Sequence, residues 1–241
     1  MQDRLDNSDV LEIKVYYSLY MLFPEQIAAI RKIKQLEEYK HSTTINLLFI
    51  PVFTSMLESL FADLFDQYLD KHRRESGDDL KNNLIDSLSS NLQKATWRNY
   101  KDAFITVFGK QINDFVPTES MQAVEALFVL RNQVIHGKQI SHTIKSAGDE
   151  VERIYLDGHY KTVNEFFLSK KLMNKDELAS LIFLSNKIVD YFLSHIKEFC
   201  SALATKIMEP NELLMYQIIK SGFLDKFSTI SIEIAEINKE L

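Results

Sequence analysis

The residues best suited to chemistry lie in the stretch "ALFVLRNQVIHGKQI", residues 126–140. Arg131 interrupts an apolar helical pattern, and His136 stands directly before a glycine of the kind that ends helices. An arginine can clamp a phosphate through two parallel hydrogen bonds, and a histidine can transfer protons near neutral pH. Asn132 can orient the histidine or donate a hydrogen bond to the same anion. These residue types are those that break a phosphodiester without a metal ion.

The expected helix surrounds Arg131 with apolar neighbours. The residues three and four positions away from it are Leu127, Phe128, Val134 and Ile135. An unpaired buried guanidinium is costly, so it requires an anion, a carboxylate or an interface. The ordinary alternative is an ion pair with Glu58 or Glu125, or an arginine that reaches solvent. For His136 the ordinary alternative is a cap on the last helix carbonyls.

The segment "RNQVIHG" resembles the signature of the HEPN superfamily, which is an arginine, a polar residue, and a histidine a few positions later. Leu130 and Gly137 complete the "LRNxxxHG" form that is common in that family. Members are helical bundles, and an earlier helix with a polar or acidic position, here "TSMLESLF", packs beside the motif. The resemblance extends over about residues 42–205 in the order of the helices.

The resemblance implies a metal-independent RNA endonuclease in which Arg131, Asn132 and His136 are catalytic. The ribose 2′-hydroxyl would attack the phosphorus, His136 would transfer protons, and Arg131 would stabilise the charged intermediate. HEPN domains typically dimerise so that two motifs form one site. A composite site is needed because residues five apart on a helix point about 140° away from each other. We therefore expect a homodimer formed through the face of Val124, Leu127, Phe128, Arg131 and Val134.

Other residues are weaker candidates for substrate contact: Lys138, His142 and Glu58. We expect neither a metal nor a cofactor, since no clustered Asp and His pattern and no glycine-rich nucleotide loop occurs.

The composition is that of a helical protein without an obvious membrane or secretory signal. The chain has 241 residues with only 6 Gly and 4 Pro, which favours long helices. A net charge of −6 argues against a surface that coats nucleic acid, although residues 94–145 carry seven Lys and Arg against four Asp and Glu. One cysteine, Cys200, excludes an intrachain disulfide. With no signal peptide and no uninterrupted apolar run that could span a bilayer, we expect a cytoplasmic protein.

The elements predicted from periodicity form a mainly α, HEPN-like bundle with a small β-hairpin. We divide the chain into an N-terminal extension (1–41), the bundle (42–208) and a C-terminal extension (209–241). The hairpin is placed at about 150–168 because Asp157-Gly158 separates two β-prone runs. The strongest helical stripe follows Ser42, is interrupted by Pro51, and continues to about residue 72.

The function expected from this pattern is RNA cleavage in prokaryotic defence or in a toxin–antitoxin pair, with an antitoxin or other protein as a further partner. Two alternatives remain. The first is a non-catalytic HEPN-like scaffold that binds RNA or protein. The second is a nucleotide-binding partner of a nucleotidyltransferase, in which Arg131 would hold a phosphate without cleaving it.

Overall fold

The computed structural model describes residues 22–39, 42, 44–92, 95–136, 142–147, 150–155, 158–174 and 184–207. Within these ranges it describes the backbone alone at residues 134, 136, 142–147, 150–155 and 158–160. The protein is mainly helical, as predicted. The elements run in the order α1 (Phe23–Gln35), α2 (Phe49–Glu75), α3 (Asp79–Leu92), α4 (Trp97–Phe108), α5 (Thr118–His136), β1 (His142–Ala147), β2 (Glu150–Tyr155), α6 (Gly158–Ser169) and α7 (Asn186–Ile207).

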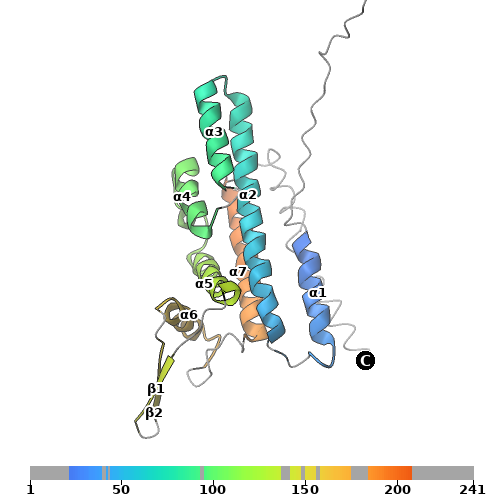
Figure 1. The fold of residues 1–241 in the computed structure, drawn as a ribbon, viewed down its shortest axis with the longest axis vertical. Helices are drawn as coiled ribbons and strands as arrows, with labels where there is room; N and C mark the ends of the chain where they lie inside the picture. Colours follow the sequence, from blue (N-terminus) through green and yellow to red (C-terminus); the bar gives the residue numbers. More distant parts are fainter. Residues whose placement is uncertain are drawn as a thin grey trace, which may run out of the picture.

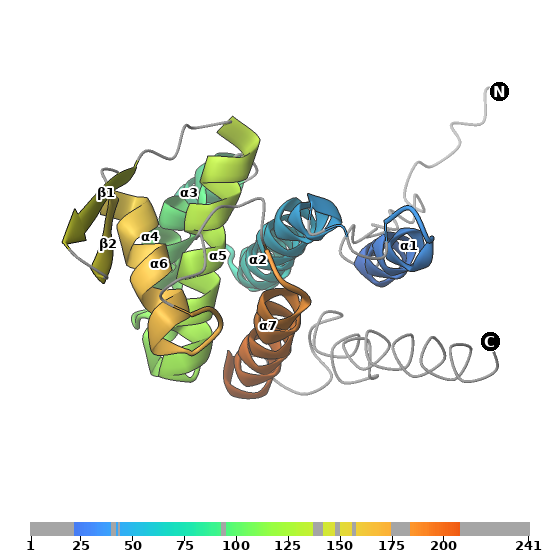
Figure 2. The same cartoon turned by 90° about the horizontal axis from the view of Figure 1, so that it is seen from below.

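Helix α2 is the central element of the bundle. It contacts α1 on one side and α3, α5 and α7 on the others, and Figure 2 shows α1 separated from α3–α6 by α2. Its apolar stripe includes Phe53, Leu57 and Phe61, which are fully buried. A 3₁₀ turn over Thr44–Leu48 precedes the helix, and Pro51 occupies its first turn, where a missing N–H breaks no helical bond.

Aromatic side chains from three helices meet around Phe61. Its ring centroid lies 5.3 Å from that of Trp97, 5.7 Å from Tyr100, 6.3 Å from Phe104 and 6.1 Å from Phe199. Such pairs each contribute about 0.5–1.5 kcal/mol beyond the burial of their area. This cluster joins α2, α4 and α7 into one core.

Helix α1 shares that core. Phe23, Ile27 and Ile30 are buried in the same cluster, and α1 packs on α2 (Figure 1). The described part of the predicted N-terminal extension therefore contributes to the bundle. Residues 1–21 and 208–241, which hold the rest of both predicted extensions, lie outside the described residues.

The segment after α5 differs from the prediction. Strands β1 and β2 pair antiparallel with His142 opposite Tyr155, and residues from Gly158 to Ser169 form helix α6. The predicted hairpin at 150–168, with Asp157-Gly158 as its turn, is therefore wrong in position. Val163 and Phe167, four residues apart, are buried, and the ring of Phe167 lies 6.1 Å from Phe192 of α7. This helical spacing outweighs the local turn preference.

One helix has the length and composition of a membrane span. The stretch Thr44–Glu75, which includes α2, meets both criteria, and half of its most apolar window is buried inside the protein. From the sequence we expect no stretch that could span a bilayer, and this helix is an exception. It is apolar around most of its circumference because other helices cover it on several sides.

Candidate functional site

Helix α5 carries the predicted catalytic residues near its C-terminal end. Leu127 and Leu130 are fully buried, so they fix the helix against the bundle. Asn132 and Ile135 lie on the exposed side, and Ile135 is 49% exposed. The prediction that Ile135 belongs to a packed stripe around Arg131 is therefore wrong. Arg131 lies at the boundary between the two sides, with 30% of its side chain exposed.

Glu58 of α2 is the carboxylate that faces Arg131. The Arg131 Nη2 and Glu58 Oε2 atoms lie 3.8 Å apart, and 23% of the Glu58 side chain is exposed. This distance fits an electrostatic pair but exceeds that of a hydrogen bond. Glu58 is one of the two carboxylates that the sequence suggests as ion-pair partners of Arg131. The other, Glu125, accepts a hydrogen bond of 2.9 Å from Lys101 instead.

The guanidinium of Arg131 has unused donors. Its Nη1 donates to Asn132 Oδ1 at 3.2 Å, while its buried Nε has no hydrogen-bond partner among the described residues. A guanidinium offers five N–H donors in a planar fork. Only one Nη1 donor is hydrogen-bonded among the described residues, so Arg131 retains Nη donors for an anion that approaches from the exposed side.

Burial makes the Glu58 carboxylate harder to ionise. Burial raises the pKa of Glu58 above its ordinary value, and the positive charge of Arg131 opposes that rise. The negative partner of Arg131 is therefore a partly buried carboxylate whose ionised form is favoured by the arginine and disfavoured by burial.

The remaining predicted site residues are placed only in part. His136 is the last residue of α5, one turn beyond Asn132 along the helix backbone, and His142 is the first residue of β1. The side chains of both histidines, the whole of Lys138 and the predicted helix end at Gly137 lie outside the described residues. The structure therefore brings together Arg131, Asn132 and Glu58.

The face predicted to dimerise is buried inside one chain. Val124, Leu127 and Phe128 are at most 5% exposed, and Phe128 stacks on Trp97. That interface prediction is wrong for these three residues, because they pack against α4 and the rest of the bundle within one chain. Any dimer that joins two copies of the motif must use the exposed side of α5.

A buried polar residue in the motif was overlooked. Gln133 is only 4% exposed, and its Oε1 has no hydrogen-bond partner among the described residues. The sequence "RNQ" reads as a polar run, which hides the fact that the helix turns its third member inward.

A second polar cluster that sequence reasoning also overlooked ties the start of α5 to α7. Ser120 is fully buried, and its Oγ lies 3.1 Å from His195 Nδ1 and donates to Glu198 Oε2. Glu119 accepts from Lys170 at 2.9 Å and from Tyr191 at 3.3 Å. Both the serine and the carboxylate approach the same ring nitrogen, since His195 Nδ1 is also 3.3 Å from Glu198 Oε2. A serine nucleophile needs its base on one ring nitrogen and the orienting acid on the other, so this cluster is a structural clamp.

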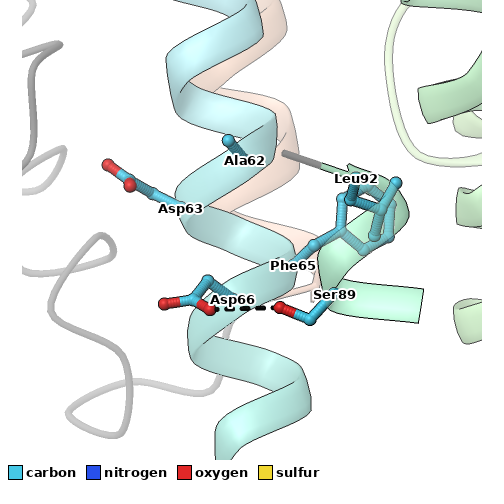
Figure 3. A pocket seen from close by; sticks show the side chains of 6 residues that line it. All are labelled: Ala62, Asp63, Phe65, Asp66, Ser89 and Leu92. Atoms are coloured by element: carbon cyan, nitrogen blue, oxygen red, sulfur yellow. Dashed lines mark hydrogen bonds between the residues drawn. The ribbon is translucent and has the colours of Figure 1, made fainter. Parts of the chain in front are cut away.

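The described residues also form a small pocket between α2 and α3. It has a volume of about 210 Å³ and is lined by Ala62, Asp63, Phe65, Asp66, Ser89 and Leu92. Figure 3 shows Phe65 against Leu92, the Ser89 hydroxyl on Asp66, and Asp63 extending to the opposite side of α2. Burial and the nearby Asp66 raise the pKa of Asp63 to about 6. Arg131 does not line this pocket.

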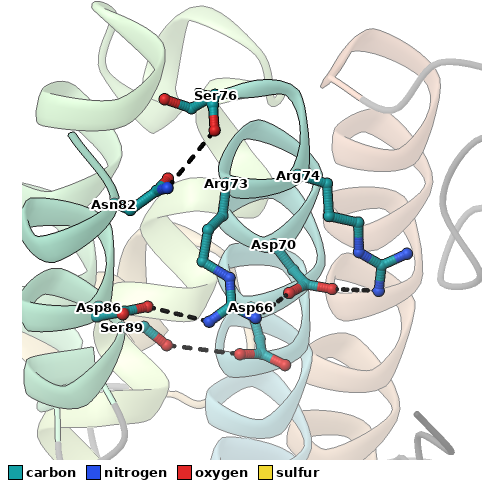
Figure 4. Close-up of polar contacts among 8 residues, drawn as sticks. All are labelled: Asp66, Asp70, Arg73, Arg74, Ser76, Asn82, Asp86 and Ser89. Atoms are coloured by element: carbon teal, nitrogen blue, oxygen red, sulfur yellow. Dashed lines mark hydrogen bonds and ion pairs between the residues drawn. The ribbon is translucent and has the colours of Figure 1, made fainter. Parts of the chain in front are cut away.

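The end of the same helix pair is held by ion pairs. Asp70, only 7% exposed, accepts from Arg73 at 3.1 Å and from Arg74 at 2.6 Å, and Arg73 also reaches Asp86 of α3 (Figure 4). These charges neutralise one another and fasten α3 to α2.

No family model, curated protein or solved structure matches this chain. Among the residues that the structure describes, no three His, Cys, Asp or Glu side chains are grouped to hold a metal ion. An arginine with free donors and an exposed amide suit the binding of an anion, while the carboxylate of Glu58 competes with that anion for the arginine.

Proposed function

We propose that the protein is a metal-independent RNA endonuclease of the HEPN type, and that it acts as a cytoplasmic homodimer in defence or in a toxin–antitoxin pair. The observation that carries the proposal is the incomplete hydrogen bonding of Arg131. This arginine is partly exposed, has a buried Nε without a partner among the described residues, and is paired with Glu58 only at 3.8 Å. A purely structural arginine would be expected to satisfy more of its donors.

In the proposed reaction Arg131 binds a phosphodiester and stabilises the charge that develops as the 2′-hydroxyl attacks the phosphorus. His136 accepts the hydroxyl proton, or donates a proton to the departing 5′-oxygen. Asn132 donates to the phosphate from the exposed side of α5. Two copies that meet through the side bearing Asn132 and Ile135 supply both proton-transfer roles.

Cleavage of a labelled RNA in EDTA tests this proposal. The expected products carry 2′,3′-cyclic phosphate and 5′-hydroxyl ends, and 2′-O-methyl RNA of the same sequence is not cut. Arg131→Ala and His136→Ala each lower the rate about a hundredfold or more, the usual scale for losing a charge stabiliser or an acid–base group. Arg98→Ala, which removes an exposed arginine of α4, keeps the parent rate. Activity that disappears with EDTA and returns with Mg²⁺ contradicts the mechanism.

The second candidate function is a non-catalytic scaffold, favoured by the same ion pair. If Arg131 exists to hold α5 to α2 through Glu58, the protein cleaves no RNA, and loss of Arg131 acts through folding alone. The stability measurements described in the Discussion separate the two.

A further inference from the structure

The pair between Arg131 and Glu58 joins two helices at the edge of the proposed site. The two side chains are 30% and 23% exposed, so solvent reaches both, yet each is partly shielded by the bundle. At 3.8 Å the charges attract one another without the fork-to-fork geometry that makes an Arg–carboxylate pair strong. The arginine is therefore held loosely and can exchange one anion for another.

An anion that binds Arg131 must approach the Glu58 carboxylate as well. A phosphate hydrogen-bonds to a guanidinium at about 2.7–2.9 Å. Because Glu58 Oε2 is itself 3.8 Å from Nη2, the phosphate and the carboxylate become close neighbours of like charge. Their repulsion is relieved when Glu58 becomes neutral.

The surroundings of Glu58 favour its neutral form once the arginine turns to a new partner. Two titratable groups from other helices interact with Glu58: Arg131 of α5, which lowers the pKa of Glu58, and Tyr100 of α4, whose own pKa Glu58 helps to raise. Burial and nearby carboxylates raise the pKa of Tyr100 to about 12, and its hydroxyl donates to the Leu92 carbonyl, so it stays neutral and adds no positive charge. Arg131 alone lowers the pKa of Glu58, while burial raises it. When a phosphate binds the arginine, its negative charge offsets the effect of Arg131, so the rise in pKa caused by burial is no longer opposed.

We propose that Glu58 is a proton-operated gate on Arg131, holding the guanidinium while the site is empty and taking up a proton when a phosphate group binds. For RNA as the source of that phosphate, this inference rests on the proposed function. The sign of the coupling follows directly. Since the complex binds one more proton than the free protein, affinity for the phosphate rises as pH falls, by at most about tenfold per pH unit.

The test is binding of a fluorescent 2′-O-methyl RNA, which cannot be cleaved, between pH 5.5 and 8.5 at constant ionic strength. Histidine side chains as a class exchange protons near neutral pH, and His136 and His142 lie in or near the motif, so the measurements use a His136→Gln/His142→Gln background. In that background the dissociation constant for the RNA is expected to fall severalfold for each unit by which the pH is lowered. Adding Glu58→Gln removes this slope and tightens binding most at high pH. Adding Glu125→Gln instead, which removes the carboxylate paired with Lys101, keeps the slope.

The outcomes distinguish the gate from the function on which it rests. If Arg131→Ala weakens binding but Glu58→Gln leaves the slope unchanged, the gate is overturned and phosphate binding at Arg131 stands. If Glu58→Gln weakens binding at every pH, Glu58 supports the site instead of closing it, and the gate is again overturned. If Arg131→Ala leaves binding unchanged, no phosphate uses this arginine, and the gate and the proposed function both fail.

A second measurement does not depend on how Glu58→Gln folds. Calorimetry of the same binding reaction in two buffers with different heats of ionisation gives the number of protons taken up. The gate requires a net uptake at about pH 7 in the background that lacks both histidines. Equal heats in the two buffers mean that no proton is taken up, and this result overturns the proposal.

Discussion

Phe128 of α5 stacks flat on Trp97 of α4, with ring centroids 4.6 Å apart and planes 8° from parallel. Phe128 is one turn before Arg131, so this contact sets both the height and the rotation of the helix that presents the site. It also explains why Arg131 lies at an edge: Phe128, one turn earlier, points to an aromatic ring of the same chain, while Ile135, one turn later, is exposed.

Phe128→Ala is expected to destabilise the protein by about 3–5 kcal/mol, because it removes a buried ring and leaves a cavity beside Trp97. Urea unfolding, followed by tryptophan fluorescence, measures the change. Ile105→Ala, at an apolar side chain that is 45% exposed, is expected to change stability by less than about 0.5 kcal/mol. Similar small effects at both positions would contradict the packing described here.

Arg131→Ala is expected to change stability by only about 0–1 kcal/mol, although it greatly lowers the proposed activity. Both members of the pair are partly exposed and 3.8 Å apart, so the value for surface ion pairs applies more closely than the 3–5 kcal/mol for a buried one. A double-mutant cycle with Glu58→Gln measures the coupling. A coupling near 4 kcal/mol, in a protein that cleaves no RNA, would favour the scaffold.

Ser120→Ala is expected to destabilise the fold by about 1–3 kcal/mol and to leave cleavage intact. It removes the hydroxyl of a fully buried serine and with it two hydrogen bonds, each worth about 0.5–1.5 kcal/mol, while His195 and Glu198 stay paired with each other. Thermal unfolding and an RNA cleavage assay test the two halves. Loss of cleavage in a variant that remains folded at the assay temperature would place Ser120 in the chemistry.

Asp63→Asn is expected to stabilise the protein at pH 7.5 and to have little effect at pH 4. Burial and Asp66 raise the pKa of Asp63 to about 6, above its ordinary value of 3.8, so the native state favours the protonated form. That stability is present at low pH and is lost as pH rises from about 4 to 6. Urea unfolding at several pH values measures it, and Asp102→Asn, at an exposed carboxylate, should show no such trend.

The sequence was sufficient for the long central helix but not for α6 or for the surroundings of the site. The four-residue spacing of Phe53, Leu57 and Phe61 predicts α2, because a long stripe has one consistent period. The same reasoning could not decide whether the apolar neighbours of Arg131 face another helix or a second molecule, since burial and an interface require the same residue types.

Two further differences have a common cause. Asp157-Gly158 favours a turn locally, and a serine near the start of a helix commonly serves as a cap, but the folded chain uses Gly158 and Ser120 in another way. Gly158 starts α6, whose Val163 and Phe167 are buried, while Ser120 reaches across to α7. In each case a partner distant in the sequence decides the outcome, and no local pattern records that partner.

Helix α2 packs against a helix that lies much later in the sequence, and this has a consequence for protein synthesis. Phe61 contacts Phe199, so one side of this helix is covered by residues made about 140 positions later. At about 5–20 residues per second, a ribosome takes roughly 10–30 s to supply them. During that interval a helix apolar enough to suit a bilayer has an uncovered aromatic face. The nascent chain is therefore expected to need a chaperone until α7 has been made, and its yield should fall sharply in cells depleted of the chaperones that bind emerging chains.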